Sequence, residues 1–150
     1  FMLQKEVVER LTASPGTRDW GRLSIMVQYH CQADYLFFVP PEAFSPPPRV
    51  DSAVVRLIPH ASPPHPADDE GHLRKLVAQA FTQRRKAIRN GLKSWVSAEQ
   101  FQALGIDAGL RPDQLSVADY VALANISRPA DAEEEGSAPH TEQGKGDSTP

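Results

Sequence analysis

The pattern of apolar and polar positions divides the chain into a mixed first part and a helical second part. Two apolar runs, residues 35–39 and 53–58, are rich in β-branched and aromatic side chains, which is typical of β-strands. Residues 1–3 are predicted to be the end of another strand. Apolar positions recur with helical spacing over residues 5–11 and 23–30, so each of these segments is predicted to form a helix.

Strand signals stop after residue 60. The proline-rich segment 62–66 is predicted to be a linker between two domains. One long helix is predicted from His72 to Asn90, and Ser97 and Ser116 have the capping-box spacing that begins two shorter helices. The predicted divisions are residues 1–60, a small all-α domain at residues 61–127 and a disordered acidic tail at residues 128–150.

A long loop separates the two strong strand segments and carries three consecutive prolines. Each proline fixes its own φ, so residues 46–48 are expected to hold the preceding Phe44 ring in place. One interpretation is a stiff connector whose Phe44 packs on the protein's own core. The other is a platform on which a nucleobase stacks, an interaction worth about 1–3 kcal/mol per base.

The net charge of −3 hides a basic region. Residues 129–150 hold six acidic residues and one lysine, which leaves 15 basic and 13 acidic residues in positions 1–128. Residues 71–98 contain seven Lys or Arg and no Asp or Glu. A merely solvated helix face usually mixes the two signs, so this segment is a candidate for binding phosphate. The candidate contacts in this segment are Arg84, Arg85, Lys86, Arg89 and Lys93, and Arg49 of the proline loop is a further candidate.

Several functional classes find no support in the sequence. No apolar run is long enough to predict a transmembrane helix, and the single Cys31 fits a reducing cytoplasm. We expect no metal site, because no His, Cys and Asp residues have ligand spacing, and no glycine-rich nucleotide loop is present. A first residue other than Met suggests a fragment of a longer protein. The residues alone therefore predict an RNA- or phosphate-binding α/β fragment with a helical module.

Four separate segments resemble the KsgA (RsmA) family of ribosomal RNA adenine dimethyltransferases. These segments occur in the family's order and spacing, and the resemblance extends to about residue 126. They are FMLQKEVVERL (1–11), GRLSIMVQY (21–29), FSPPPRVDSAVVRL (44–57) and AFTQRRKAIRN (80–90).

The resemblance implies a fold, a reaction and roles for residues. The fold would be the C-terminal part of a Rossmann-like methyltransferase sheet followed by a small all-α domain. The reaction would be S-adenosylmethionine-dependent dimethylation of adenines in small-subunit ribosomal RNA during ribosome biogenesis. Phe44 would stack on the flipped-out adenine, and the basic segment would bind the RNA backbone.

The family's donor-binding loop, its acidic ribose-binding residue and its N-L-P-Y motif have no counterpart in this sequence. No cofactor-binding residue is therefore predicted in this chain, and the chain alone is expected to be inactive. Three alternatives stay open: an enzyme acting on large-subunit RNA, which the QRRK sequence at residues 83–86 resembles less well, a non-catalytic RNA-binding or ribosome-assembly module, and a plain scaffold or interaction protein. A plain scaffold protein would show no salt-dependent RNA binding.

Overall fold

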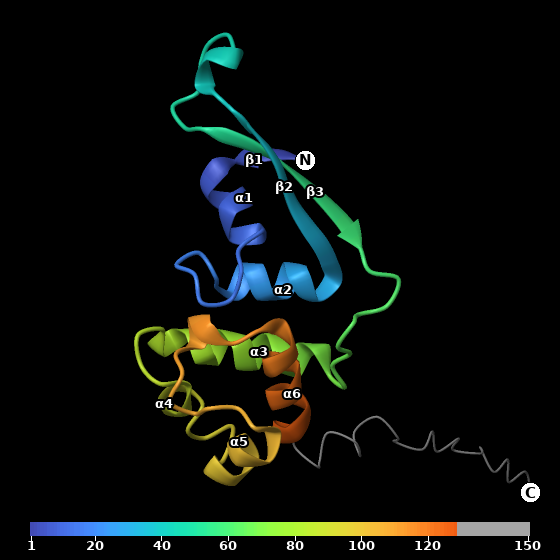
Figure 1. The fold of residues 1–150 in the computed structure, drawn as a ribbon, viewed down its shortest axis with the longest axis vertical. Helices are drawn as coiled ribbons and strands as arrows, with labels where there is room; N and C mark the ends of the chain where they lie inside the picture. The colour runs from blue at the N-terminus through green and yellow to red at the C-terminus, as the bar shows by residue number, and fades with distance from the viewer. Residues whose placement is uncertain (129–150) are drawn as a thin grey trace, which may run out of the picture.

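The computed structural model describes residues 1–128, which form a three-stranded sheet with two helices followed by a group of helices (Figure 1). The sheet is antiparallel with strand order β1-β3-β2. It therefore has β3 at its centre and β1 and β2 at its two edges. The elements of this part are β1 (Met2–Gln4), α1 (Lys5–Leu11), α2 (Arg22–His30), β2 (Cys31–Val39) and β3 (Ser52–Pro59).

Alternation along β3 gives the sheet one covered face and one open face. Ala53 and Val55 are fully buried beneath Val8 and Leu11 of α1. The intervening Val54 lies on the opposite face, because successive side chains of a strand point to opposite sides. The apolar spacing predicted for the first helix is thus confirmed.

The helical part follows the linker and contains four α-helices, α3 to α6, and two short 3₁₀ turns. The largest side chains of its core include Leu73, Ile88 and Tyr120, all fully buried. The elements are α3 (Glu70–Ala80), η2 (Phe81–Gln83), α4 (Ile88–Gly91), α5 (Ala98–Leu104), η3 (Pro112–Gln114) and α6 (Val117–Ser127).

Local sequence signals explain where three of these helices begin. The Asp69 side chain accepts a hydrogen bond from the His72 amide and caps α3. Ser97 with Gln100 and Ser116 with Asp119 form the predicted capping boxes of α5 and α6. Each satisfies main-chain N–H groups that have no partner inside the helix.

The prediction of a single long helix from His72 to Asn90 is wrong, because the α-helix ends at Ala80. The amide of Ile88 donates to the Leu110 carbonyl at 2.6 Å, and that of Arg89 donates to the Ala108 carbonyl at 3.2 Å. These bonds replace the helical bonds that a continuous helix would make. A Cβ on Gly91 would lie 3.2 Å from the Ala80 carbonyl oxygen, so glycine lets α4 pack tightly against the end of α3.

The core of the helical part includes side chains from before the linker. Trp20, Ile25 and Tyr29 are buried in the same cluster as Leu73 and Tyr120. The Tyr29 hydroxyl also accepts a hydrogen bond from the Ala67 amide at 3.1 Å. The two parts are therefore packed through a shared core, and the predicted boundary near residue 60 stays a prediction.

The acidic tail, predicted to be disordered from residue 128, lies outside the described residues except for Arg128. No helix within residues 1–128 combines the length and apolar character needed to cross a membrane.

Candidate nucleic-acid interface

The break between α3 and α4 places the predicted basic residues on an exposed turn. All five are exposed, and they extend from the end of η2 into α4 and the turn after it. They do not share one helix face, because the predicted long helix is interrupted here. We call this group the basic surface; it comprises Arg84, Arg85, Lys86, Arg89 and Lys93.

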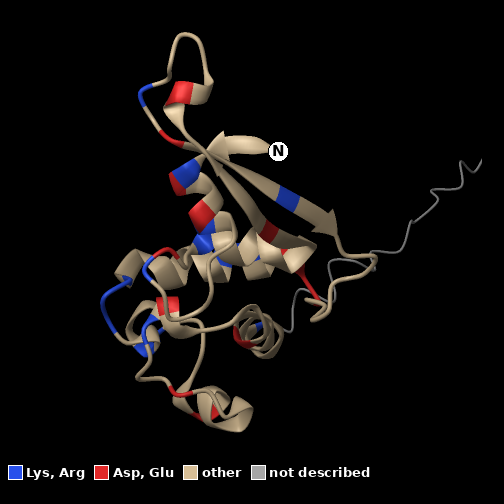
Figure 2. Ribbon diagram, turned by 45° about the horizontal axis from the view of Figure 1, so that its top comes forward, with Lys and Arg blue, Asp and Glu red and all other residues tan. Residues whose placement is uncertain are grey.

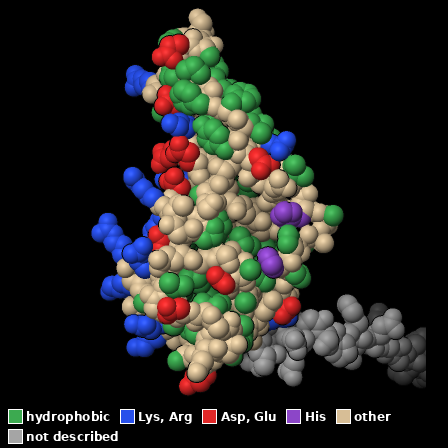
Figure 3. Space-filling view, viewed as in Figure 1, with side chains coloured by type: hydrophobic (Ala, Val, Ile, Leu, Met, Phe, Trp, Pro, Cys, Tyr) green, Lys and Arg blue, Asp and Glu red, His purple; other side chains and the backbone are tan. Residues whose placement is uncertain are grey.

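Lys and Arg side chains gather along one edge of the molecule. The ribbon coloured by residue charge shows them on the turn that joins α3 to α4 (Figure 2). The space-filling view shows basic side chains projecting from this edge, while apolar side chains dominate the upper part over the sheet (Figure 3). Such a one-sided distribution gives a local positive field in spite of the net negative charge.

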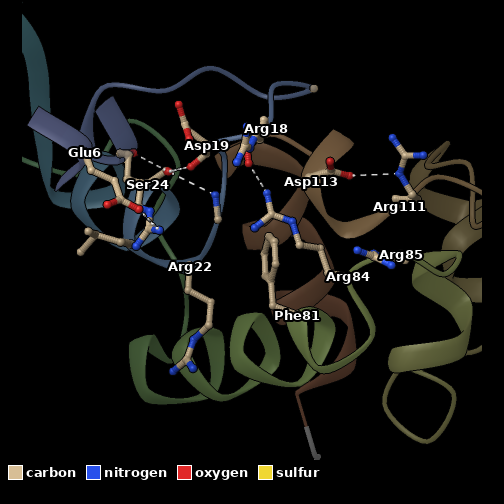
Figure 4. Close-up of a pocket in the computed structure, with 14 residues that line it drawn as sticks. Glu6, Arg18, Asp19, Arg22, Ser24, Phe81, Arg84, Arg85, Arg111 and Asp113 are labelled. Carbon is tan, nitrogen blue, oxygen red and sulfur yellow. Dashed lines mark hydrogen bonds and ion pairs between the residues drawn. The ribbon is translucent and has the colours of Figure 1, made fainter. Parts of the chain in front are cut away.

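An open pocket of about 1110 Å³ lies between the sheet part and the helical part. One wall comes from α1, the loop before α2 and the start of α2, and the other from the turn after α3 and the segment around η3 (Figure 4). We call it the arginine pocket, because six arginines and only three acidic residues line it. The arginines are Arg10, Arg18, Arg22, Arg84, Arg85 and Arg111, and the acidic residues are Glu6, Asp19 and Asp113.

Two of the six arginines are paired with acidic residues of the pocket itself. Arg10 Nη2 lies 2.7 Å from Glu6 Oε1, and Arg111 Nε lies 3.4 Å from Asp113 Oδ1. Within residues 1–128, the side chains of Arg18, Arg22 and Arg85 make no ion pair or hydrogen bond, so the pocket has an excess of positive charge. An anionic group with several acceptor oxygens would complement it.

The buried Ser24 fixes the shape of one pocket wall. Its hydroxyl donates to the Arg10 carbonyl at 2.5 Å and accepts from the Gly21 amide at 3.2 Å. Ser24 is fully buried, so these bonds are protected from water. They join the end of α1 to the start of α2 and hold the arginines of both elements on one wall.

The proline loop lies at the opposite end of the molecule from the helical part (Figure 1). Phe44, which follows the 3₁₀ turn η1 (Pro41–Ala43), is half-buried, and Arg49 is exposed. Arg49 lines a smaller hollow of about 320 Å³ together with Lys5 and Glu6. Because Glu6 also lines the arginine pocket, the two hollows adjoin along α1.

The structure brings together only some of the predicted residues. Arg84 and Arg85 share the arginine pocket, while Phe44 and Arg49 lie on the distant loop. The sequence reasoning missed the four other pocket arginines, at positions 10, 18, 22 and 111. The repeated arginines in the segment 18–22 were the available signal, but nothing local indicates that this segment faces residue 84.

Comparison with known proteins identifies the family. The family model for ribosomal RNA adenine dimethylase matches residues 1–128, which is most of the chain. The chain belongs to the ribosomal RNA adenine dimethylase family. The predicted resemblance to these enzymes is therefore confirmed.

Relatives of this chain carry the name ribosomal RNA small subunit methyltransferase A. The one from Alcanivorax borkumensis is 92% identical over 149 residues, covering 99% of this chain and 53% of the relative. The one from Pseudomonas aeruginosa is 62% identical over 125 residues, covering 83% of this chain and 47% of the relative. The chain thus spans about half the length of the curated relatives it matches.

Solved structures agree with the predicted fold class. A dimethyladenosine transferase from Plasmodium falciparum superposes with a TM-score of 0.69 at 25% identity, over 81% of this chain and 54% of that one. The 23S rRNA methyltransferase ErmE gives 0.64 at 22% identity, over 84% and 52%, and shows likeness of fold alone. The fold is therefore α/β, the C-terminal part of a Rossmann-like methyltransferase sheet followed by helices.

Proposed function

We propose that this chain is the target-recognition part of an S-adenosylmethionine-dependent enzyme that dimethylates adenines in small-subunit ribosomal RNA. The observation that carries the proposal is the basic surface beside the arginine pocket, on a chain that matches the dimethylase family over residues 1–128. The relative with 92% identity is named as a small-subunit methyltransferase. This supports the small subunit, rather than the large subunit, as the partner of the whole protein. The whole protein would act in the cytoplasm.

RNA backbone would bind along the positively charged edge. Arg85, Lys86, Arg89 and Lys93 are exposed, and the arginine pocket adds Arg18 and Arg22 from the other wall. Arginine forks suit phosphate because they donate two parallel hydrogen bonds. Each contact with a phosphate releases counterions, so the affinity should fall as the salt concentration rises.

Phe44 would act on the target base rather than on the backbone. Extruding a nucleotide from a helix costs a few kcal/mol, and stacking of the base on an aromatic ring offsets about 1–3 kcal/mol of that cost. Arg49, beside the smaller hollow below this loop, would bind the backbone near the flipped base. One RNA would then extend from the proline loop to the basic surface.

The methyl donor does not fit the arginine pocket. S-adenosylmethionine carries a positive sulfonium, and the large hollow of residues 1–128 is lined by six arginines against three acidic residues. An arginine-rich wall disfavours a cation. No residue within residues 1–128 is therefore assigned to the donor.

A second candidate is a non-catalytic RNA-binding or ribosome-assembly module. The feature that favours it is that residues 1–128 provide an RNA-type surface without a group of residues suited to a donor or a metal ion. The coding sequence upstream of residue 1 separates the two candidates. A donor-binding loop followed by an N-L-P-Y motif supports the enzyme, and an unrelated upstream domain supports the module.

Calorimetry tests the proposal on the chain itself. We expect small-subunit ribosomal RNA to bind with an affinity that weakens as salt rises, and S-adenosylmethionine to give no heat of binding at micromolar concentrations. Micromolar binding of the donor would overturn the assignment of this chain to target recognition alone. RNA binding that is absent, or independent of salt, would favour a scaffold protein instead.

A further inference from the structure

Arg84 differs from the other basic residues of its turn because its guanidinium group already has partners. Its Nη2 donates to the main-chain carbonyl of Arg18 and, at 3.1 Å, to that of Trp20. An Nη2 group carries two hydrogens, so these two carbonyls use both of them. The close-up shows the Arg84 tip turned toward Arg18, while Arg85 lies on the side of Arg111 (Figure 4).

The surroundings of Arg84 keep its side chain in this direction. Its guanidinium carbon lies 6.0 Å from the centre of the Phe81 ring, within the range of a cation–π contact. Its Nη1 would lie 3.9 Å from a Cβ built on Gly21. The side chain therefore spans the gap between the turn after α3 and the loop before α2.

The loop that Arg84 holds is fixed to the helical part at two other points. The Gly16 amide donates to the Asp113 carbonyl at 2.7 Å, and the Trp20 indole Nε1 donates to the Leu115 carbonyl at 2.7 Å. Between these points lies Arg18, and the loop ends at Arg22, the first residue of α2. Arg84 is thus the contact that links the carbonyls of this loop directly to the basic turn.

We propose that Arg84 is a positioning residue that sets the separation between the two arginine walls of the pocket, rather than a phosphate contact. Its bonds to the loop fix where Arg18 and Arg22 stand relative to Arg85. The expected effect on RNA affinity rests on the proposed function, whereas the role of Arg84 in holding the loop does not. Because the loop is already held in place, less conformational entropy would be lost when RNA binds.

Two pairs of matched substitutions at neighbouring positions separate positioning from phosphate binding. Arg84→Lys keeps the positive charge, but the lysine side chain is one bond shorter and lacks the two terminal nitrogens of the guanidinium group. Arg84→Gln removes the charge. Arg85→Lys and Arg85→Gln make the same changes one residue further on. The readouts are hydrogen exchange of the amides at residues 17–21, affinity for labelled small-subunit ribosomal RNA, and the slope of log affinity against log salt, all well below the unfolding temperature.

For Arg84→Lys we expect faster exchange of the loop amides and an RNA affinity lower by roughly fivefold, as for loss of about one hydrogen bond. The salt slope should stay that of the parent in both Arg84 variants. Arg85→Gln should leave loop exchange unchanged and lower the slope by about 0.7 to 0.9, whereas Arg85→Lys should keep both the loop exchange and the slope of the parent and weaken RNA binding only through loss of the guanidinium fork.

Full RNA affinity in Arg84→Lys would overturn the inference, and so would unchanged loop exchange in both Arg84 variants. A slope in Arg84→Gln lowered as much as in Arg85→Gln would show a phosphate contact instead. If the parent chain binds no RNA, the proposed function fails, and loop exchange alone still decides whether Arg84 holds the loop.

Discussion

The indole nitrogen of Trp20 donates a 2.7 Å hydrogen bond to the main-chain carbonyl of Leu115, which joins two segments 95 residues apart. Both residues are almost completely buried. The bond lies in the core shared by the loop before α2 and the helical part. Buried packing at Trp20 therefore contributes, together with Arg84, to the relative placement of the two pocket walls.

Replacing Trp20 by Phe should destabilise the whole chain. The substitution leaves the buried Leu115 carbonyl without its donor, which costs about 1–3 kcal/mol, and it removes part of the packing. Urea unfolding followed by circular dichroism measures the change. Trp95→Phe is the control, because Trp95 is only half-buried and its loss should shift the midpoint less. Equal shifts in the two variants would contradict the anchoring role of Trp20.

His72 should make stability depend on pH. Its Nε2 lies 3.0 Å from the Ser127 hydroxyl, and its ring stacks on Trp95 with 5.4 Å between the ring centres. Burial is the main cause that lowers the pKa of His72 below its ordinary value of 6.5, and the nearby Lys75 and Arg128 lower it further against the opposing effect of Asp69. The folded chain thus favours the neutral imidazole.

The unfolded chain binds a proton at His72 more readily than the folded chain does. Stability from this residue is therefore present above pH 6.5 and is lost as the pH falls from 6.5 through the lowered pKa. The His72 amide lowers the pKa of Asp69, whose contribution is lost only below about 3.8. Denaturation midpoints at pH 7.5 and 5.5 should differ less in His72→Asn than in the parent, whereas His65→Asn should behave as the parent does. The same difference in all three proteins would show that His72 is not the cause of the pH dependence.

The open face of the sheet should make the isolated chain associate. Cross-strand register places Met2 and Phe37 on either side of Val54, on the face opposite α1, and Met2 and Phe37 are 51% and 55% exposed. Exposed apolar rows beside free strand edges promote aggregation.

Phe37→Ser should reduce self-association in sedimentation and reduce binding of an apolar dye, with little change in the unfolding midpoint. Val55→Ser is the contrasting variant, because Val55 is fully buried and its substitution should lower the midpoint instead. Unchanged association in Phe37→Ser would show that this face does not drive self-association.

Local sequence signals predicted some elements well and others poorly. The boxes at Ser97 and Ser116 depend on residues three positions apart, so the starts of α5 and α6 could be predicted. The break after Ala80 could not, because it depends on the bond from Ile88 to Leu110, 22 residues away. Phe44 and Arg49 were found from their motif, and their roles stay predictions.

The arginine pocket shows the same limit at the level of the site. Composition identified the run of basic residues that includes Arg84 and Arg85, since charge is visible without a fold. The opposite wall, with Arg18 and Arg22, appears only when buried Trp20 places its loop beside residue 84. Sequence reasoning therefore identified residues of one wall of the pocket and missed the other wall.

The salt dependence of RNA binding tests the central claim most directly. The chain should bind small-subunit ribosomal RNA with a negative slope of log affinity against log salt, and Arg85→Ala with Lys86→Ala should make that slope shallower by about 1.5. Arg56→Ala is the control, because Arg56 lies on the open sheet face and pairs with Asp34 at 3.1 Å. A double variant with the parent's slope would contradict the claim that this turn binds the RNA backbone.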